Sequence, residues 1–324
     1  MLLSILGVLA FSLLTTMTFS YFLIPRLKRF GMVGKDVNKE GRPEVSEMGG
    51  LAIIAGFTAG ILLAIMLNTF NGMEFNITYV LAALVTIHAM GFIGIVDDLL
   101  DIPQAVKAFL PLAAAVPLVA VSAAGSTAMV VPFVGEVDFG LFYIIVLIPV
   151  GVAVASNLTN MLAGFNGMEA GMGSITMLTM AAIAYSMGNV EMLVLFVPML
   201  GALLGFLKFN WYPAKAFPGD VGNLTIGAVV AAGVIIGDLE TAGALILSLY
   251  VVDFFIKAYN RFPSSKWWGE IKEGKLYPVG GKVRGFAQLV MKMGGGISER
   301  GLVLVFMGMQ AVVGLAVLLM FVGV

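Results

Sequence analysis

The chain has 324 residues, of which 60% are hydrophobic and only 11% are charged, and its mean hydropathy is +1.02. A water-soluble fold of this composition would lack the polar surface to cover its core, so a soluble globular protein is excluded. The absence of cysteine excludes disulfides, a thiolate metal site and a cysteine nucleophile, and the net charge of −1 gives no indication of a nucleic-acid partner.

Apolar stretches long enough to cross a bilayer recur along the whole chain. They predict an all-α polytopic membrane protein with about ten transmembrane helices, forming a single domain over residues 1–324. Strands of a membrane barrel would alternate polar and apolar residues, which these stretches do not. The first span is expected to stay in the mature protein, because no charged region precedes it. The expected spans are residues 2–24, 48–67, 77–96, 105–122, 140–156, 170–187, 191–207, 221–236, 241–258 and 300–322.

The eighteen Lys and Arg residues all fall in the connections that follow odd-numbered spans. Six lie in 25–47, one is Lys107, two lie in 208–220 and nine lie from Lys257 to Arg300. The opposite connections carry acidic residues and no basic ones. By the positive-inside rule the basic face is cytoplasmic, which places both termini outside and a long loop, about 259–299, inside. We therefore expect the chemistry at the cytoplasmic face.

Adjacent carboxylates end the third span in the segment GFIGIVDDLLDIPQAVKAFLP. Asp97 and Asp98 repel one another, so a cation, a shared proton or a basic partner is expected beside them. Lys107, at the start of the next span, is one such partner. The alternative is a solvated loop that caps two helices.

A cluster of Asn and Gly follows the fifth span in ASNLTNMLAGFNGMEAGMGS. Asn157 and Asn160 are three residues apart and share a helix face. Glycines such as Gly164 allow backbone amides to approach a ligand closely. A helix C-cap and turn is the plainer interpretation, which the density of polar residues disfavours.

Asp220 stands just before the eighth span, after the chain-breaking Pro218 and Gly219. It could hold a metal ion that phosphates also bind, or it could be a simple helix N-cap. Phe217 could stack on a base or anchor the chain at the membrane interface.

The basic loop from Lys257 to Arg300 suits either a nucleotide diphosphate or anionic lipid headgroups. Asp253 lies inside the ninth span, four residues before Lys257, and we expect a structural ion pair there. His88, the only histidine, is expected to be a packed or water-bonded side chain inside the third span.

Together the motifs resemble those of the polyprenyl-phosphate N-acetylhexosamine-1-phosphate transferase superfamily. The resemblance rests on EMGGL at 47–51, the DD pair with Lys107, NLTNMLAGFNGMEAG at 157–171 and NWYPAKAFPGD at 210–220. Where bacterial peptidoglycan enzymes carry aspartates in the central motif, this chain has Ala163 and Asn166, and its late loop has no histidine. The chain therefore looks more like the eukaryotic UDP-GlcNAc:dolichyl-phosphate GlcNAc-1-phosphate transferase and its archaeal relatives.

This resemblance implies a Mg²⁺-dependent enzyme, with Mn²⁺ as a possible substitute, that moves GlcNAc-1-phosphate from UDP-GlcNAc onto a polyprenyl or dolichyl phosphate at the inner face of the cell membrane. It implies that Asn160 and Asp220 coordinate the metal and that Lys107 contacts the diphosphate. Asp97 and Asp98 would serve the attacking lipid phosphate or polarise the metal site. The residues implied to bind substrate are Glu47, Asn157, Gly164, Asn166, Phe217, Arg261 and Lys266.

The late loop departs from the eukaryotic pattern, which has an Arg-His-Arg run where this chain has Ser264, Ser265 and Lys266. Arg261 and Lys266 could substitute for it. Another UDP-sugar or undecaprenyl phosphate therefore stays open, as does a nucleotide-sugar or lipid transporter. Relatives of this type are often dimers, so a homodimer is also expected.

Overall fold

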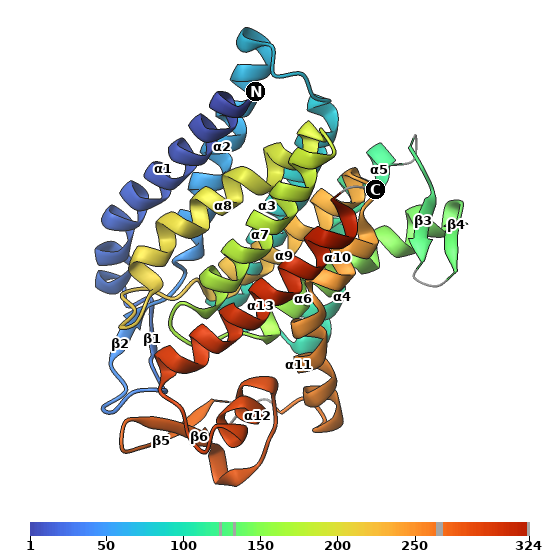
Figure 1. Ribbon diagram of the computed structural model, residues 1–324. Helices are drawn as coiled ribbons and strands as arrows, with labels where there is room; N and C mark the ends of the chain where they lie inside the picture. Colours follow the sequence, from blue (N-terminus) through green and yellow to red (C-terminus); the bar gives the residue numbers. More distant parts are fainter. Residues whose placement is uncertain (123–124, 132–133, 264–267, 323–324) are drawn as a thin grey trace.

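The computed structural model describes residues 1–122, 125–131, 134–263 and 268–322 (Figure 1). Most of the chain forms long helices that run side by side, and three two-stranded hairpins occupy the connections. The helices are α1 Leu2–Arg29, α2 Gly50–Asn71, α3 Ile77–Leu100, α4 Gln104–Ala114, α5 Val116–Ser122, α6 Ile148–Met161, α7 Met168–Ser186, α8 Val190–Asn210, α9 Gly219–Ile236, α10 Glu240–Ile246, α11 Ser248–Tyr259, α12 Phe286–Met293 and α13 Glu299–Phe321. The hairpins are β1 Val33–Lys35 with β2 Glu44–Ser46, β3 Ala128–Val131 with β4 Gly135–Asp138, and β5 Gly269–Lys272 with β6 Lys275–Pro278. A π-helical turn, Tyr143–Leu147, leads into α6, and a 3₁₀ turn, Val279–Gly281, follows β6.

Each of the ten expected spans falls on a helical segment. Among the described residues, seven helices are long and apolar enough to cross a membrane, and an eighth span results if α10 and α11, bent by 61°, are counted as one. The other two expected spans are α7 and the segment 105–122. The latter is divided into α4 and α5, and Pro117 at the start of α5 lacks the N–H that would continue the first helix.

Helices α8 and α9 form the centre of the bundle. In their most apolar 18-residue windows, 78% and 83% of the residues are buried, against 22% in α1 and 33% in α13. α3 and α6 pack on α9, while α1, α2 and α7 pack on α8. The outer faces of α1 and α13 therefore remain available to lipid.

Glycines allow the central helices to approach closely near the start of α9. A Cβ on Gly94 of α3 would lie 2.7 Å from the carbonyl carbon of Asp220, and closer still to backbone atoms of Val221. A Cβ on Gly50 of α2 would lie 2.6 Å from the carbonyl oxygen of Pro218. The N-terminus of α9 is thus enclosed by α2 and α3.

The hairpins β1–β2 and β5–β6 lie with α12 at one end of the bundle, where α1 also ends, and both chain termini lie at the other end (Figure 1). The segments richest in Lys and Arg therefore share one end, as the charge pattern predicted. The hairpins and α12 were not predicted. Each strand has only three or four residues, too few for its alternation to stand out in a loop sequence.

Candidate active site

Three charged side chains from three helices meet at the end of the bundle that carries the basic segments. Lys107, in the first turn of α4, forms ion pairs with Asp97 near the end of α3 and with Asp220 in the first turn of α9. The turn between α3 and α4 is fixed by Asp97, whose Oδ1 accepts a hydrogen bond of 3.1 Å from the Ile102 amide. The predicted partnership of Lys107 with the DD pair is therefore present at Asp97, and Lys107 is also paired with Asp220.

Asp98 lies on a different surface of α3 and holds the start of α9. Its Oδ1 accepts from the Asp220 amide at 2.9 Å and its Oδ2 from the Val221 amide at 3.2 Å. Gly219 has a φ of +67° and lies against this carboxylate, so the position suits a residue without a side chain. Asp98 thus supplies an N-terminal cap to α9 from a neighbouring helix.

Asn160, near the end of α6, is hydrogen-bonded to α9 one turn beyond Asp220. Its Oδ1 accepts a hydrogen bond of 3.1 Å from Nδ2 of Asn223, and the adjacent Thr159 hydroxyl donates to the Asn223 carbonyl at 2.8 Å. Asn223 follows Asp220 by three residues and shares its helix face. The sequence analysis missed Asn223, although its spacing from Asp220 was a usable signal.

The oxygen atoms gathered here fit a hard divalent cation. Within the described residues, no three His, Cys, Asp or Glu side chains form a metal-binding group. Mg²⁺, however, prefers oxygen donors and is commonly held by one or two carboxylates together with water and substrate phosphates. Asp220 supplies a carboxylate and Asn160 an amide oxygen, while the Oδ1 of Asn223 is buried and has no hydrogen-bond partner in the described part of the chain.

The local charge also favours a cation. Asp97, Asp98 and Asp220 are joined by Glu47, yet Lys107 is the one basic side chain paired within this group in the described residues. Burial, and then repulsion by Asp98, raises the pKa of Glu47 above its ordinary value. An anionic diphosphate would add to this excess of negative charge, so its binding requires additional positive charge.

The segments that carry Glu47 and Phe217 are joined along their backbones. The Phe217 amide donates to the Ser46 carbonyl, the Gly49 amide to the Phe217 carbonyl and the Gly50 amide to the Pro218 carbonyl, each at 2.8 Å. Both Glu47 and Phe217 are half-buried. The structure therefore brings these two predicted residues together beside the start of α9.

Asn166 and Gly164 join loops that are distant in sequence. Asn166 is 1% exposed, and its Oδ1 accepts from Lys39 at 2.7 Å and from the Ala214 amide at 2.8 Å. Its Nδ2 donates to Asp36 at 3.0 Å. The Gly164 carbonyl accepts from Asn38 at 2.9 Å, and its φ of +102° explains the glycine. In this arrangement both residues hold the connection between β1 and β2 to the 157–171 segment.

Within the described residues, two predicted substrate-binding residues, Asn157 and Arg261, are not joined to the charged cluster of Asp97, Lys107 and Asp220. Asn157 donates to the Ala153 carbonyl of its own helix at 2.8 Å. Arg261 is exposed in the turn after α11, and no ion pair joins it to the cluster in the described part of the chain. Lys266 lies outside the described residues.

Two expectations of structural roles are confirmed. Asp253 and Lys257 form an ion pair at 2.7 Å, and Asp253 also accepts from the Phe286 amide at 2.8 Å, which links α11 to α12. His88 is 3.0 Å from the Thr58 hydroxyl and 2.7 Å from the Leu84 carbonyl, within the helices and away from the cluster.

A mostly apolar cavity of about 340 Å³ lies along the bundle. It lies between α6, α9 and the bent pair α10–α11, and Leu158, one residue from Thr159, forms part of its wall. Leu147, Val230 and Val251 line it further along. Asp97, Lys107, Asn160 and Asp220 do not line this cavity, and Tyr143 and Glu240 are polar residues in its wall.

Comparisons with known proteins identify the family of the chain. The profile of "Glycosyl transferase family 4" matches residues 80–238, which include the DD pair, Lys107, Asn160 and Asp220. A Sulfolobus acidocaldarius protein with the provisional name UDP-N-acetylglucosamine–dolichyl-phosphate N-acetylglucosaminephosphotransferase is 35% identical over 318 residues, or 96% of this chain and 95% of the relative. A Saccharolobus solfataricus protein of the same name is 36% identical over 90% of this chain and 88% of its own.

A bacterial relative lies further away. The phospho-N-acetylmuramoyl-pentapeptide-transferase of Halalkalibacterium halodurans is 30% identical over 76% of this chain and 78% of its own length. The apolar helices, the charged cluster and these similarities all point to an enzyme embedded in a membrane. The chain belongs to glycosyl transferase family 4.

Proposed function

We propose that the chain transfers GlcNAc-1-phosphate from UDP-GlcNAc to a polyprenyl or dolichyl phosphate, giving lipid-diphosphate-GlcNAc and UMP. The observation that carries the proposal is the meeting of Asp97, Lys107 and Asp220 at the end of the bundle that carries the basic segments. A charged end suits a nucleotide diphosphate, and an apolar cavity suits an isoprenoid chain. The names of the two archaeal relatives support this sugar and this acceptor.

In the proposed reaction a lipid phosphate oxygen attacks the sugar-bearing phosphorus of UDP-GlcNAc. A new P–O bond forms while the bond to the oxygen of UMP breaks, and UMP leaves with that electron pair. The second pKa of a phosphate lies near 6, so the nucleophile is already ionised at neutral pH. A general base is not required, which fits a cluster whose carboxylates are engaged with Lys107 and with backbone amides.

Neutralisation and alignment of the anionic groups then dominate the barrier. Lys107 is the cation that the chain itself supplies. Asp220 and Asn160 would hold Mg²⁺, for which Mn²⁺ would substitute, and the ion would supply positive charge to the diphosphate oxygens. Asp98 keeps the amide end of α9 beside them.

The basic end of the bundle would face the cytoplasm, where nucleotide sugars are available, and the enzyme would lie in the plasma membrane as a homodimer. The positive-inside rule supports the orientation. The two termini would then lie outside.

The test is to incubate purified protein in detergent with UDP-GlcNAc, Mg²⁺ and a polyprenyl phosphate. We expect one equivalent of UMP for each lipid-diphosphate-GlcNAc identified by mass. Addition of a chelator should stop turnover, and excess Mg²⁺ should restore it. Asp220→Ala should abolish turnover, whereas Lys208→Gln, an exposed lysine at the same end, should not.

Alternative donors and activities give different results in the same assay. Preference for another UDP-sugar, including UDP-MurNAc-pentapeptide, or for undecaprenyl phosphate would keep the reaction class and replace the substrate. Uptake of UDP-GlcNAc into vesicles without UMP release would contradict the proposal and indicate a transporter.

A further inference from the structure

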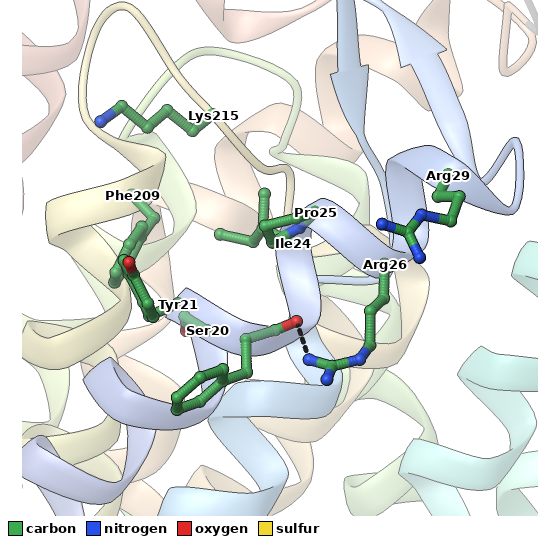
Figure 2. A pocket seen from close by; sticks show the side chains of 9 residues that line it. Ser20, Tyr21, Ile24, Pro25, Arg26, Arg29, Phe209 and Lys215 are labelled. Carbon is green, nitrogen blue, oxygen red and sulfur yellow. Dashed lines mark hydrogen bonds between the residues drawn. The ribbon is translucent and has the colours of Figure 1, made fainter.

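A second cavity, of about 490 Å³, opens between the last turns of α1 and the chain that follows α8 (Figure 2). It is lined by three basic side chains, Arg26, Arg29 and Lys215, and by aromatic rings that include Tyr21 and Phe209. None of the side chains of the charged cluster lines it. It is therefore distinct from the candidate active site.

The three cations of this cavity have no acidic partners. No ion pair joins Arg26, Arg29 or Lys215 to a carboxylate within the described residues, and no Asp or Glu lines the cavity. Arg26 donates to the Phe22 carbonyl of its own helix at 2.6 Å, and Figure 2 shows its guanidinium turned toward that carbonyl. Unpaired cations that share one cavity make it a site for an anion.

The other side of the cavity is apolar and faces lipid. Tyr21 and Phe22 are 67% and 55% exposed on α1, which is one of the candidate spans. Arg26 and Arg29 lie in the last turn of the same helix, and Phe209 lies in the last turn of α8. The cavity is thus positioned where a hydrocarbon layer would give way to the polar interface, with cations on the polar side.

We propose that this cavity binds the phosphate headgroup of an anionic membrane phospholipid, with its acyl chains against the exposed rings of Tyr21 and Phe22. A free phosphate ion would neutralise the cations, but it has no apolar part to contact the rings. A phospholipid satisfies both, because its charge and its chains lie on opposite sides of the same interface.

Bound lipid would also stabilise the segments that carry Ser46 and Phe217, which lie next to the candidate active site. The Ile24 carbonyl, in the wall of the cavity, accepts from the Ser46 hydroxyl at 3.2 Å, and the Ser46 carbonyl accepts from the Phe217 amide. On the other wall, Lys215 lies in the same loop as Phe217. In Figure 2 the side chain of Lys215 points away from Arg29, so its charge would attract the headgroup without sharing it with that arginine.

The test measures lipid retention and requires no turnover, so its outcome is independent of the proposed function. Protein is reconstituted in nanodiscs of phosphatidylcholine with a minority of phosphatidylglycerol, transferred to mild detergent, and the retained lipids are counted by native mass spectrometry. We expect wild-type protein to retain one phosphatidylglycerol in preference to phosphatidylcholine. Loss of each cation in Arg29→Gln and Lys215→Gln should weaken retention about fivefold, and the double variant should lose the preference.

Matched controls lie on the same two elements. Lys28→Gln and Lys208→Gln remove exposed cations next to Arg29 and Phe209 that do not line the cavity, and they should retain the lipid. Arg29→Lys keeps the charge and should retain it as well. Equal retention in wild type and the double variant would overturn the proposal.

Competition identifies the source of the phosphate. Millimolar inorganic phosphate should not displace the bound lipid, and polyprenyl phosphate should not replace it at equal concentration. Displacement by inorganic phosphate would show that the cavity binds phosphate ions from the solvent. Preference for polyprenyl phosphate would show that it binds the lipid acceptor of the proposed reaction. Either result would contradict the phospholipid assignment.

Discussion

Lys107 balances two carboxylates that belong to different helices, so its removal has an effect beyond the loss of one contact. Without the ammonium group, Asp97 and Asp220 repel one another across the site. The transferred group also loses the chain's own positive charge at this position.

We expect Lys107→Gln to lower the turnover number by about 10²- to 10³-fold, in the range found when a transition-state charge partner is removed. UMP release at saturating UDP-GlcNAc and Mg²⁺ measures it. Lys208→Gln is the matched control. If Lys107→Gln lowered the thermal unfolding midpoint but kept normal turnover per folded molecule, the role of Lys107 would be structural only.

Asp98 differs from its neighbour because both of its oxygens accept backbone amides of α9. Removal of the acceptor in Asp98→Ala leaves the amides of Asp220 and Val221 unpaired. Such a loss costs about 1–3 kcal/mol for each unsatisfied group, so stability and activity should fall together.

Thermal unfolding in detergent, followed beside UMP release, distinguishes the two effects of Asp98→Ala. Asp101→Asn is the control, since Asp101 is an exposed residue with a φ of +48°, a conformation that Asn tolerates. An Asp98→Ala variant with unchanged stability and no activity would show instead that this carboxylate acts on the substrate.

At the scale of the element, the position of α9 depends on a glycine of α3. A methyl group at Gly94 would collide with the backbone of Asp220 and Val221, so α9 would have to move away from α3. That shift would separate Asp220 from Lys107 and Asp97, which lie on the α3–α4 side.

We therefore expect Gly94→Ala to lose most activity and to unfold at a lower temperature. Gly308→Ala, on α13, is the control, because a Cβ there meets no atom within 4 Å. It should be neutral or slightly stabilising, since alanine favours a helix more than glycine does. Normal turnover in Gly94→Ala would show that the spacing of α3 and α9 is not critical.

Periodicity and hydropathy were sufficient to locate the helices of the bundle, because each expected span is long and mostly apolar, but not to locate α12. They could not show that the segment 105–122 is two helices or that 241–258 is bent, since both depend on local backbone geometry. The pairing of Asp97 with Lys107 could be anticipated from their charges and proximity in sequence.

The remaining contacts of the site could not be anticipated in the same way. Asn166 is expected to bind substrate, and in the structure its side chain forms hydrogen bonds with Lys39, Asp36 and the Ala214 amide. These partners are 48 to 130 residues away. Contacts at such separations follow from the packing of the whole bundle and leave no local signal.

At the scale of the whole molecule, the absence of cysteine allows the orientation of the bundle in the membrane to be measured directly. Single cysteines at Glu74, between α2 and α3, and at Lys272, in β5, would lie at opposite ends of the bundle. With the basic end in the cytoplasm, a membrane-impermeant maleimide should label Glu74→Cys in intact cells and Lys272→Cys only after lysis. The reverse pattern would place the charged cluster outside, and the cysteine-free chain controls for background labelling.

The lysine that bridges α3 and α9 has a thermodynamic consequence. An arriving diphosphate meets an ammonium group that already has two anionic partners, so it gains little by recruiting Lys107 alone. A divalent ion that took over Asp220 would free the lysine for the nucleotide. Nucleotide and ion should therefore each tighten the binding of the other by the same factor, as reciprocal linkage demands.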